Sequence, residues 1–277
     1  MAIQHFIPEI WNAQMLTDFR EQAVAANLVN REYEGDATRG NTVKITSAVD
    51  VTVKDYKAAG RTTSADAVSD DGQDLLIDQE KSFDFYIDDI DRAQAAGSMD
   101  VYTRSAAEGL AEDADKFILA TAVTGADSDN ILDPATISTG DEAFDVLMDL
   151  ALALNVRNVP KGNRVAVINA RFERLLLGAD SKLTSVDTSG TPAGLRDAIV
   201  GRLGGFTIVS SENLPETDVP QALAFYRPSI AYVSQIEKTE AMRAQDKFAD
   251  RLRGLHVYGG KVIRPTGVAV FTGQAGS

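Results

Sequence analysis

The chain has 277 residues, enough for one large core or two lobes, and its 44% hydrophobic and 25% charged residues are ordinary for a globular protein. It contains no cysteine, which excludes disulfides and thiolate metal sites, and its net charge of -14 disfavours binding to nucleic acid over a broad surface. No apolar run reaches the ~18–20 residues of a membrane span, and the first residues lack a signal-peptide pattern, so we expect a soluble protein made in a cytoplasm.

Residues 1–41 are predicted to form an N-terminal arm. A modest helical pattern runs from 9 to 27, but its apolar positions are loosely spaced, so this helix is expected to lie along another surface. Residues 42–56 and 75–87 then alternate apolar and polar side chains as strands do, and the tip between them is rich in small and polar residues. They predict a two-stranded excursion over 42–88, which needs a surface to lie on because an isolated ribbon is marginal in water.

The clearest helix is predicted over residues 98–123. Ser98 can cap its N-terminus, Asp100 favours the first turn through the helix dipole, and an apolar stripe follows at helical spacing. At a rise of ~1.5 Å per residue the helix is ~35–40 Å long. It is long enough to act as a spine across the whole subunit.

A compact α/β lobe is predicted after the spine helix. Its short segments are helix 139–158, strand 164–168, helix 170–177, a helix opened by Pro192, strand 206–210 and strand 222–226. Residues 229–272 are mostly strand, and the spine helix offers a face that can cover them.

Motifs for metal binding are weak. The two histidines, His5 and His256, lie far apart in the sequence, and no zinc-binding motif accompanies them. Residues 127–130 resemble the start of a calcium loop. Because Ile131 and Leu132 stand where a ligand oxygen and a glycine are needed, we expect a polar turn there instead.

Motifs for catalysis are weak as well. Asp88, Asp89 and Asp91 cluster near a predicted strand end, but the converging partners of a metal or general-acid site are not evident, so we expect an acidic edge. Gly259 and Gly260 precede a lysine but lack the spacing of a phosphate-binding loop. We therefore predict no catalytic, metal or cofactor-binding residue.

Several stretches carry a resemblance to a known family. They are Ile-Pro-Glu-Ile-Trp at 7–11, Val159-Pro160 leading into 164–168, Gly-Arg-Leu-Gly-Gly-Phe-Thr-Ile-Val at 201–209 with Ser-Glu-Asn-Leu-Pro at 211–215, and Arg264-Pro265 with Val-Ala-Val at 268–270. In this order, over nearly the whole chain, they resemble the major capsid proteins of tailed bacteriophages, which have the Hong Kong 97-type fold. In that family the last of these stretches corresponds to the final strand of the peripheral lobe.

The resemblance implies an α+β fold of four parts. They are an N-terminal arm (1–41), an extended β-hairpin loop (42–88), a peripheral lobe (89–129 and 226–277) with the spine helix (98–123), and an axial lobe (130–225). The arm is too short to hold a built-in scaffold, so a separate scaffolding protein, or none, is expected.

The resemblance also implies the function. The chain would self-assemble into pentamers and hexamers of an icosahedral shell that encloses double-stranded DNA, located in the virion and assembled in the bacterial host cytoplasm. Implied partners are other copies of the chain, a portal protein, a scaffolding protein, a decoration or cement protein, and packaged DNA without sequence-specific binding, with no membrane and no cofactor. Two alternatives stay open: an encapsulin-like compartment with protein cargo, and a hydrolase that uses the acidic cluster.

The uneven spread of charge predicts contacts between subunits. Residues 66–91 hold ten acids and one base, whereas 238–264 hold seven bases and three acids. We expect the acidic strand 74–91 of one subunit to rest on the basic strands of a neighbour, the alternative being two solvated faces. The candidate contact residues are Lys54, Lys57, Arg61, Asp78, Asp84, Asp88, Arg243, Arg251 and Arg253. Some relatives join subunits by Lys–Asn bonds, but no motif assigns that role to Lys54 or Lys57.

Overall fold

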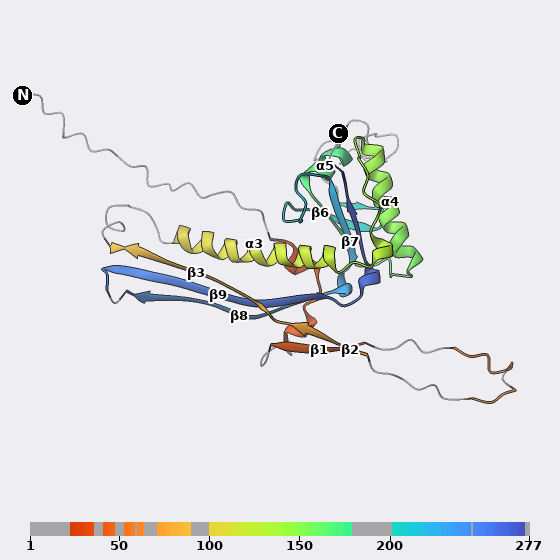
Figure 1. The fold of residues 1–277 in the computed structure, drawn as a ribbon, viewed down its shortest axis with the longest axis horizontal. Helices are drawn as coiled ribbons and strands as arrows, with labels where there is room; N and C mark the ends of the chain where they lie inside the picture. The colour runs from red at the N-terminus through yellow and green to blue at the C-terminus, as the bar shows by residue number, and fades with distance from the viewer. Residues whose placement is uncertain are drawn as a thin grey trace, which may run out of the picture.

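The computed structural model describes residues 23–35, 41–47, 53–58, 60–63, 71–89, 100–178, 201–244 and 246–274. Two lobes meet at the end of one long helix, and a hairpin extends away from both of them (Figure 1). This mixture of helices and mostly antiparallel sheets, in which β4 and β6 form a parallel pair, confirms the predicted α+β class. The short segments are α1 (Ala25–Leu28) and the 3₁₀ turns η1 (Glu32–Gly35), η2 (Ser128–Asn130), η3 (Arg227–Ser229) and η4 (Pro265–Gly267).

The peripheral lobe is a helix lying along a long sheet. The helix is α3 (Asp100–Thr124), and the antiparallel sheet has the order β3-β9-β8, with β3 (Gln79–Asp88), β8 (Ile230–Arg243) and β9 (Ala249–Val262). The Phe117 ring meets the Tyr258 ring edge-on at 5.4 Å, and the Tyr258 hydroxyl donates to Asp113 at 2.6 Å. The spine helix and its cover over the C-terminal strands are confirmed, while the proposed cap Ser98 lies outside the described residues.

The axial lobe is a five-stranded sheet with two helices on one face. Its order is β10-β7-β4-β6-β5, with β4 (Arg164–Ile168), β5 (Arg202–Leu203), β6 (Phe206–Ser210), β7 (Gln221–Tyr226) and β10 (Val268–Thr272), covered by α4 (Gly140–Val156) and α5 (Ala170–Leu176). Helix α4 begins where it was predicted because Thr139 and Glu142 form a capping box. The helix predicted after Pro192 lies outside the described residues.

The final strand lies in a different sheet from the one predicted. It was expected to end the peripheral lobe, but β10 pairs with β7 in the axial sheet. Strand β7 is buried from Gln221 to Phe225 and pairs with β4 on its other edge, so its free edge needs a partner. The apolar run Val268–Phe271 supplies that partner, because it can be buried on both faces.

The hairpin is shorter than predicted. Strand β1 (Thr42–Ser47) pairs with β2 (Asp71–Leu76), but the following residues leave the ribbon, and β3 joins β9 instead. The prediction that 75–87 forms one return strand is therefore wrong beyond Ile77. The base of the ribbon does lie on a surface, since Val43, Ile45 and Leu75 pack with residues of β8 and β9.

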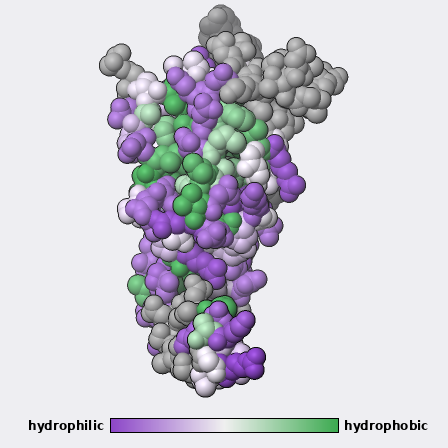
Figure 2. Space-filling view, turned by 90° about the vertical axis from the view of Figure 1, so that its right-hand side faces the viewer, coloured by the Kyte–Doolittle hydropathy of each residue, from purple (hydrophilic) through white to green (hydrophobic). Residues whose placement is uncertain are grey.

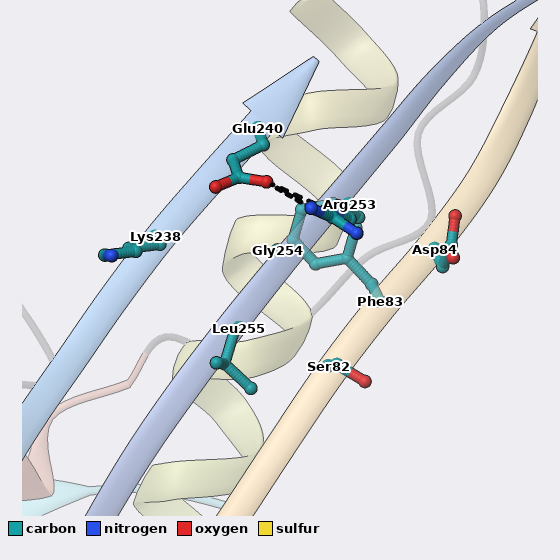
Figure 3. A pocket seen from close by; sticks show the side chains of 8 residues that line it. All are labelled: Ser82, Phe83, Asp84, Lys238, Glu240, Arg253, Gly254 and Leu255. Carbon is teal, nitrogen blue, oxygen red and sulfur yellow. Dashed lines mark hydrogen bonds and ion pairs between the residues drawn. The ribbon is translucent and has the colours of Figure 1, made fainter. Parts of the chain in front are cut away.

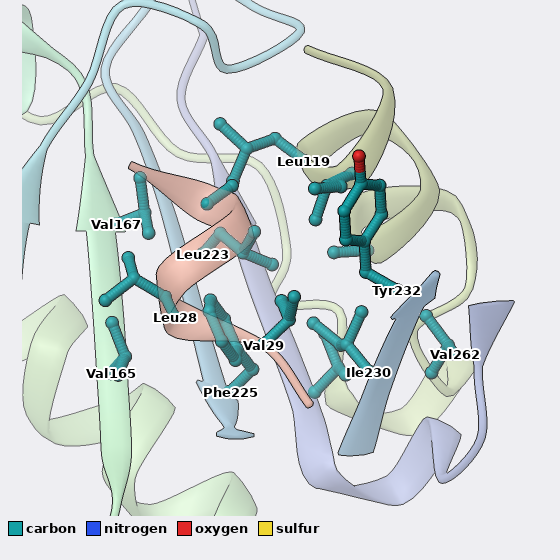
Figure 4. Close-up of a cluster of buried hydrophobic side chains, with 14 of the residues drawn as sticks. Leu28, Val29, Leu119, Val165, Val167, Leu223, Phe225, Ile230, Tyr232 and Val262 are labelled. Atoms are coloured by element: carbon teal, nitrogen blue, oxygen red, sulfur yellow. The ribbon is translucent and has the colours of Figure 1, made fainter. Parts of the chain in front are cut away.

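One hydrophobic cluster joins the two lobes. Figure 4 shows side chains from α1 (Leu28) and α3 (Leu119) meeting residues of the axial sheet such as Val167 and Phe225. Tyr232 of the long sheet lies in the same cluster. Because this core is shared, the lobes are parts of one folding unit rather than independent domains. The helical pattern predicted over 9–27 lies mostly outside the described residues.

Candidate functional site

The hairpin tip exposes both basic and apolar side chains. Lys54, Lys57 and Arg61 are all exposed there, together with Val53 and Tyr56. The turn is shaped locally: the Asp55 carboxylate accepts from the amides of Lys57 (2.9 Å) and Ala58 (3.1 Å), and Arg61 has a φ of 63°. Figure 1 shows this tip far from both lobes. The fold thus carries a polar and apolar surface well outside its own core.

The outer face of the long sheet carries a ladder of ion pairs across its strands. Arg251 donates to Asp84 (Nε to Oδ1, 2.8 Å), because antiparallel pairing of β3 with β9 sets these residues diagonally opposite. Arg253 donates to Glu240 at 2.6 Å, as Figure 3 shows. The acid–base pairing that the sequence led us to expect between subunits is thus found within one chain. Contact of these residues with a neighbour stays a prediction.

A third set of ion pairs lies at the far end of this sheet. Arg243 donates to Asp89 (Nη1 to Oδ1, 2.7 Å) and to Asp250 (3.1 Å). Asp88 ends β3 opposite Ala249, and Asp91 lies outside the described residues. The acidic cluster therefore includes a salt bridge, and the described part of the chain holds no group of three or more residues suited to a metal ion.

Hydrogen bonds between these exposed groups shift their pKa values. The bond from Arg251 holds the pKa of the Asp84 carboxyl below its usual value, and the bond from Arg253 does the same to the pKa of Glu240. The carboxylates of Asp89 and Asp84 in turn raise the pKa values of Arg243 and Arg251. Since all four groups are open to solvent, which screens them, the pairs set strand register more than they add stability.

A shallow hollow lies between these ion pairs (Figure 3). It has a volume of about 380 Å³ and is lined by Asp84, Glu240, Arg253 and the partly exposed Leu255. Gly254 and Phe83 also line it, and the Phe83 ring packs so closely on Gly254 that a Cβ there would lie 2.2 Å from the ring. Asp78, the remaining predicted contact, is exposed between β2 and β3, and its carboxylate accepts from the side-chain Nε2 of Gln79 at 3.0 Å.

A buried carboxylate that was not predicted from the sequence joins three parts of the chain. Asp115 of α3 is 1% exposed, and its Oδ1 accepts from the amides of Val24 (2.8 Å) and Ala25 (2.5 Å). Its Oδ2 accepts from the side-chain Nδ2 of Asn213 in the axial lobe at 2.9 Å. Burial raises the pKa of Asp115, and these hydrogen bonds oppose the rise. The available signal was an acid within the apolar stripe of the spine helix, beside Ala114.

The other motifs from the sequence have structural roles. Residues 127–130 form the expected polar turn, in which Asp127 caps η2 by accepting from the Asp129 amide. Gly259 lies inside β9, where a Cβ would be 2.1 Å from the Leu76 carbonyl oxygen. The His256 ring lies 3.0 Å from the Ser234 hydroxyl, and His5 lies outside the described residues. No helix in the described ranges is long and apolar enough to cross a membrane.

Comparisons with known proteins point in one direction. A family model described as phage capsid protein matches residues 72–271. A solved structure from Mycobacterium phage Che8 is 54% identical, covers 98% of each chain and has a TM-score of 0.89. The capsid structure of cyanophage P-SCSP1u is 17% identical over 98% of this chain and 94% of its own (TM-score 0.81), and the mature capsid of bacteriophage PhiM1 is 16% identical over 97% and 92% (TM-score 0.74). A search of curated proteins finds no match.

Proposed function

Since the chain belongs to the phage capsid protein family and is a major capsid protein that forms the phage shell, we propose that it builds this shell from rings of five and six copies around double-stranded DNA. The shell function places the protein in the virion. The observation that best supports rings of copies is the hairpin, whose exposed tip lies far from the chain's own lobes (Figure 1). A surface of this kind gains stability only when another molecule covers it.

Each part of the fold has a proposed role in the shell. The hairpin tip with Lys54, Lys57 and Arg61 lies over an adjacent copy, and the outer face of the long sheet meets neighbours through its ion-pair ladder. The peripheral lobe consists of α3 with β3, β8 and β9. The axial lobe, enlarged by β10, faces the centre of the ring. The strand pairing supports this revised division, because β10 is continuous with β7.

The proposed partners follow from the same role. A portal protein, a separate scaffolding protein and a decoration or cement protein would act on the assembled shell, and assembly takes place in the cytoplasm of the bacterial host. A net charge of -14 supports a wall that contains DNA without binding it strongly. The role is structural and involves no catalytic step. The salt-bridged Asp89 gives no support to a hydrolase that uses the acidic cluster.

Electron microscopy of the purified chain after size exclusion tests the proposal. We expect closed icosahedral shells, or flat rings of five and six, with DNA content in particles taken from infected cells. A compartment that encloses protein cargo and never DNA would contradict the proposed role. If the chain alone stays monomeric, co-expression with the neighbouring genes of its genome provides the scaffolding partner, and failure to form rings even then would overturn the proposal.

A further inference from the structure

One end of the axial sheet holds a basic pocket. It lies where β4 and β6 begin, and it has a volume of about 400 Å³. Its basic side chains are Lys161, Arg164, Arg202 and Arg227, and none of the described residues that line it is an aspartate or a glutamate. In a chain with 41 acids and 27 bases, a pocket whose described charged residues are all basic is a local reversal of the overall charge.

The charges of the basic pocket are not neutralised within the described part of the chain. None of the four bases forms an ion pair there, in contrast to Arg243, Arg251 and Arg253 of the long sheet. Arg164 is 3% exposed and donates to the carbonyl oxygens of Pro160 (2.9 Å) and Val159 (2.5 Å). A buried charge without a counter-charge is costly. The pocket therefore favours an anionic group supplied from outside.

The pocket is open to such a group. Lys161 and Arg202 are exposed at its rim, and a Cβ added at Gly162 or Gly205 would meet no atom within 4 Å. Gly205 has a φ of 88°, which turns the chain sharply between β5 and β6 and pairs Arg202 with Thr207, the residue of β6 that pairs with Val165 at the start of β4. The absence of side chains at the two glycines leaves room for a carboxylate to approach the basic groups.

A complementary surface lies on helix α4 of the same lobe. Asp141, Asp145 and Asp149 are exposed and spaced four residues apart, so they form a stripe along one helix face. Leu152 and Val156 follow on the exposed side and are 57% and 69% exposed. Figure 2 views the molecule from the side where α4 lies in Figure 1 and shows hydrophobic surface among hydrophilic surface. Exposed large apolar side chains beside charges are typical of a face that a partner covers.

We propose that the basic pocket of one axial lobe binds the α4 stripe of the next copy in the ring. The inference rests on the proposed assembly into rings, and it names the charged contact that joins neighbours. Two different surfaces of the same chain meet in this contact, so it is a head-to-tail interface, the kind that closes copies into a ring. Charge complementarity orients the approaching subunits, and the apolar residues at the end of the stripe become buried.

Charge reversal tests the contact. The pocket variant carries Lys161→Glu and Arg202→Glu, and the stripe variant carries Asp145→Lys and Asp149→Lys, all at exposed positions. We expect each variant to lower the yield of rings and shells at least about tenfold, because like charges then face each other. A fourfold variant with all these changes restores complementarity, and we expect its yield to return to within about threefold of the original.

Controls separate this contact from other effects. Arg171→Glu with Arg174→Glu makes the same change of net charge on α5 and is expected to assemble normally. Circular dichroism and unfolding curves check that every variant folds, and the milder pair Lys161→Gln with Arg202→Gln is expected to give an intermediate loss of yield. Normal shells from the pocket variant, or no recovery in the fourfold variant, would overturn the contact. Failure of the original chain to form any ring would instead overturn the proposed function.

Mixing gives a second readout of the same geometry. In a mixture of the pocket and stripe variants, complementary contacts form only where the two alternate around a ring. Alternation closes in a ring of six but leaves one mismatched contact in a ring of five. We therefore expect the mixture to recover rings of six and not rings of five in electron micrographs, whereas equal recovery of both rings would overturn the head-to-tail pairing.

Discussion

Asp115 is the residue at which the arm, the spine helix and the axial lobe meet. Its carboxylate has three donors, the amides of Val24 and Ala25 and the side chain of Asn213. The first two donors belong to the arm and the third belongs to the axial lobe, so all three lie far from Asp115 in sequence. A buried carboxylate of this kind orients the parts that it joins, because any change in their relative placement breaks charge-assisted hydrogen bonds.

The Asp115–Asn213 bond can be tested by exchanging its partners. Asn213→Asp places two buried carboxylates within hydrogen-bond distance, and we expect the free energy of unfolding to fall by about 3 kcal/mol. The exchanged pair, Asp115→Asn with Asn213→Asp, restores one acceptor and one donor and should recover most of this loss. Chemical unfolding of the unassembled subunit measures both. Equal losses in the single and the exchanged variants would show that the bond is not what matters at this site.

The raised pKa of Asp115 predicts a particular dependence on pH. Because burial raises the pKa of this carboxyl above its usual 3.8, the folded chain binds the proton more tightly than the unfolded chain does. Its contribution to stability is therefore fully present below pH 3.8 and is lost as the pH rises through the folded-state value. Relative to Asp115→Asn, the free energy of unfolding of the original chain should increase as the pH falls from neutral. Parallel pH curves for the two chains would contradict the assignment.

At the scale of elements, the crossing of the hairpin over the long sheet depends on one glycine. A Cβ at Gly259 would lie 2.1 Å from the Leu76 carbonyl oxygen and 2.8 Å from the Ile77 Cα, and both are backbone atoms that cannot turn away. We expect Gly259→Ala to lower the free energy of unfolding by about 3 kcal/mol, as overpacking does. Gly72→Ala on β2 is the matched control: its Cβ meets nothing within 4 Å, so thermal unfolding should shift little. Similar melting temperatures for the two variants would refute the crossing.

Local patterns predicted most elements, and distant partners decided the rest. Alternation at Val43 and Ile45 indicated β1, and apolar residues at helical spacing such as Leu147 and Leu154 indicated α4. The apolar positions after Ile77, from Phe83 to Ile87, keep the same odd-numbered phase, so the pattern could not show that β3 leaves the hairpin for β9. For the same reason the role of Asp115 escaped prediction, since its lobe partner Asn213 lies 98 residues away.

At the scale of the whole molecule, the core shared by the lobes and the exposed hairpin tip have different roles. The lobes share a core through Leu28, Leu119 and Phe225, so each copy brings a fixed angle between its lobes to the shell. The hairpin tip, in contrast, contributes little to that core because its described residues are exposed. Stability of the subunit and formation of the shell are therefore expected to respond separately to mutation.

Shortening the hairpin tests this separation. Replacing residues 53–63 by a short Gly-Ser linker keeps β1, β2 and their contacts with the long sheet, so the free energy of unfolding should change by no more than about 0.5 kcal/mol. Shell formation should fail, because the surface that covers an adjacent copy is gone. Lys54→Ala with Lys57→Ala keeps Val53 and Tyr56 and is expected to assemble with reduced yield, since surface charges guide association more than they strengthen it. Negative-stain micrographs give the result, and shells of normal size from the shortened chain would contradict the role of the hairpin.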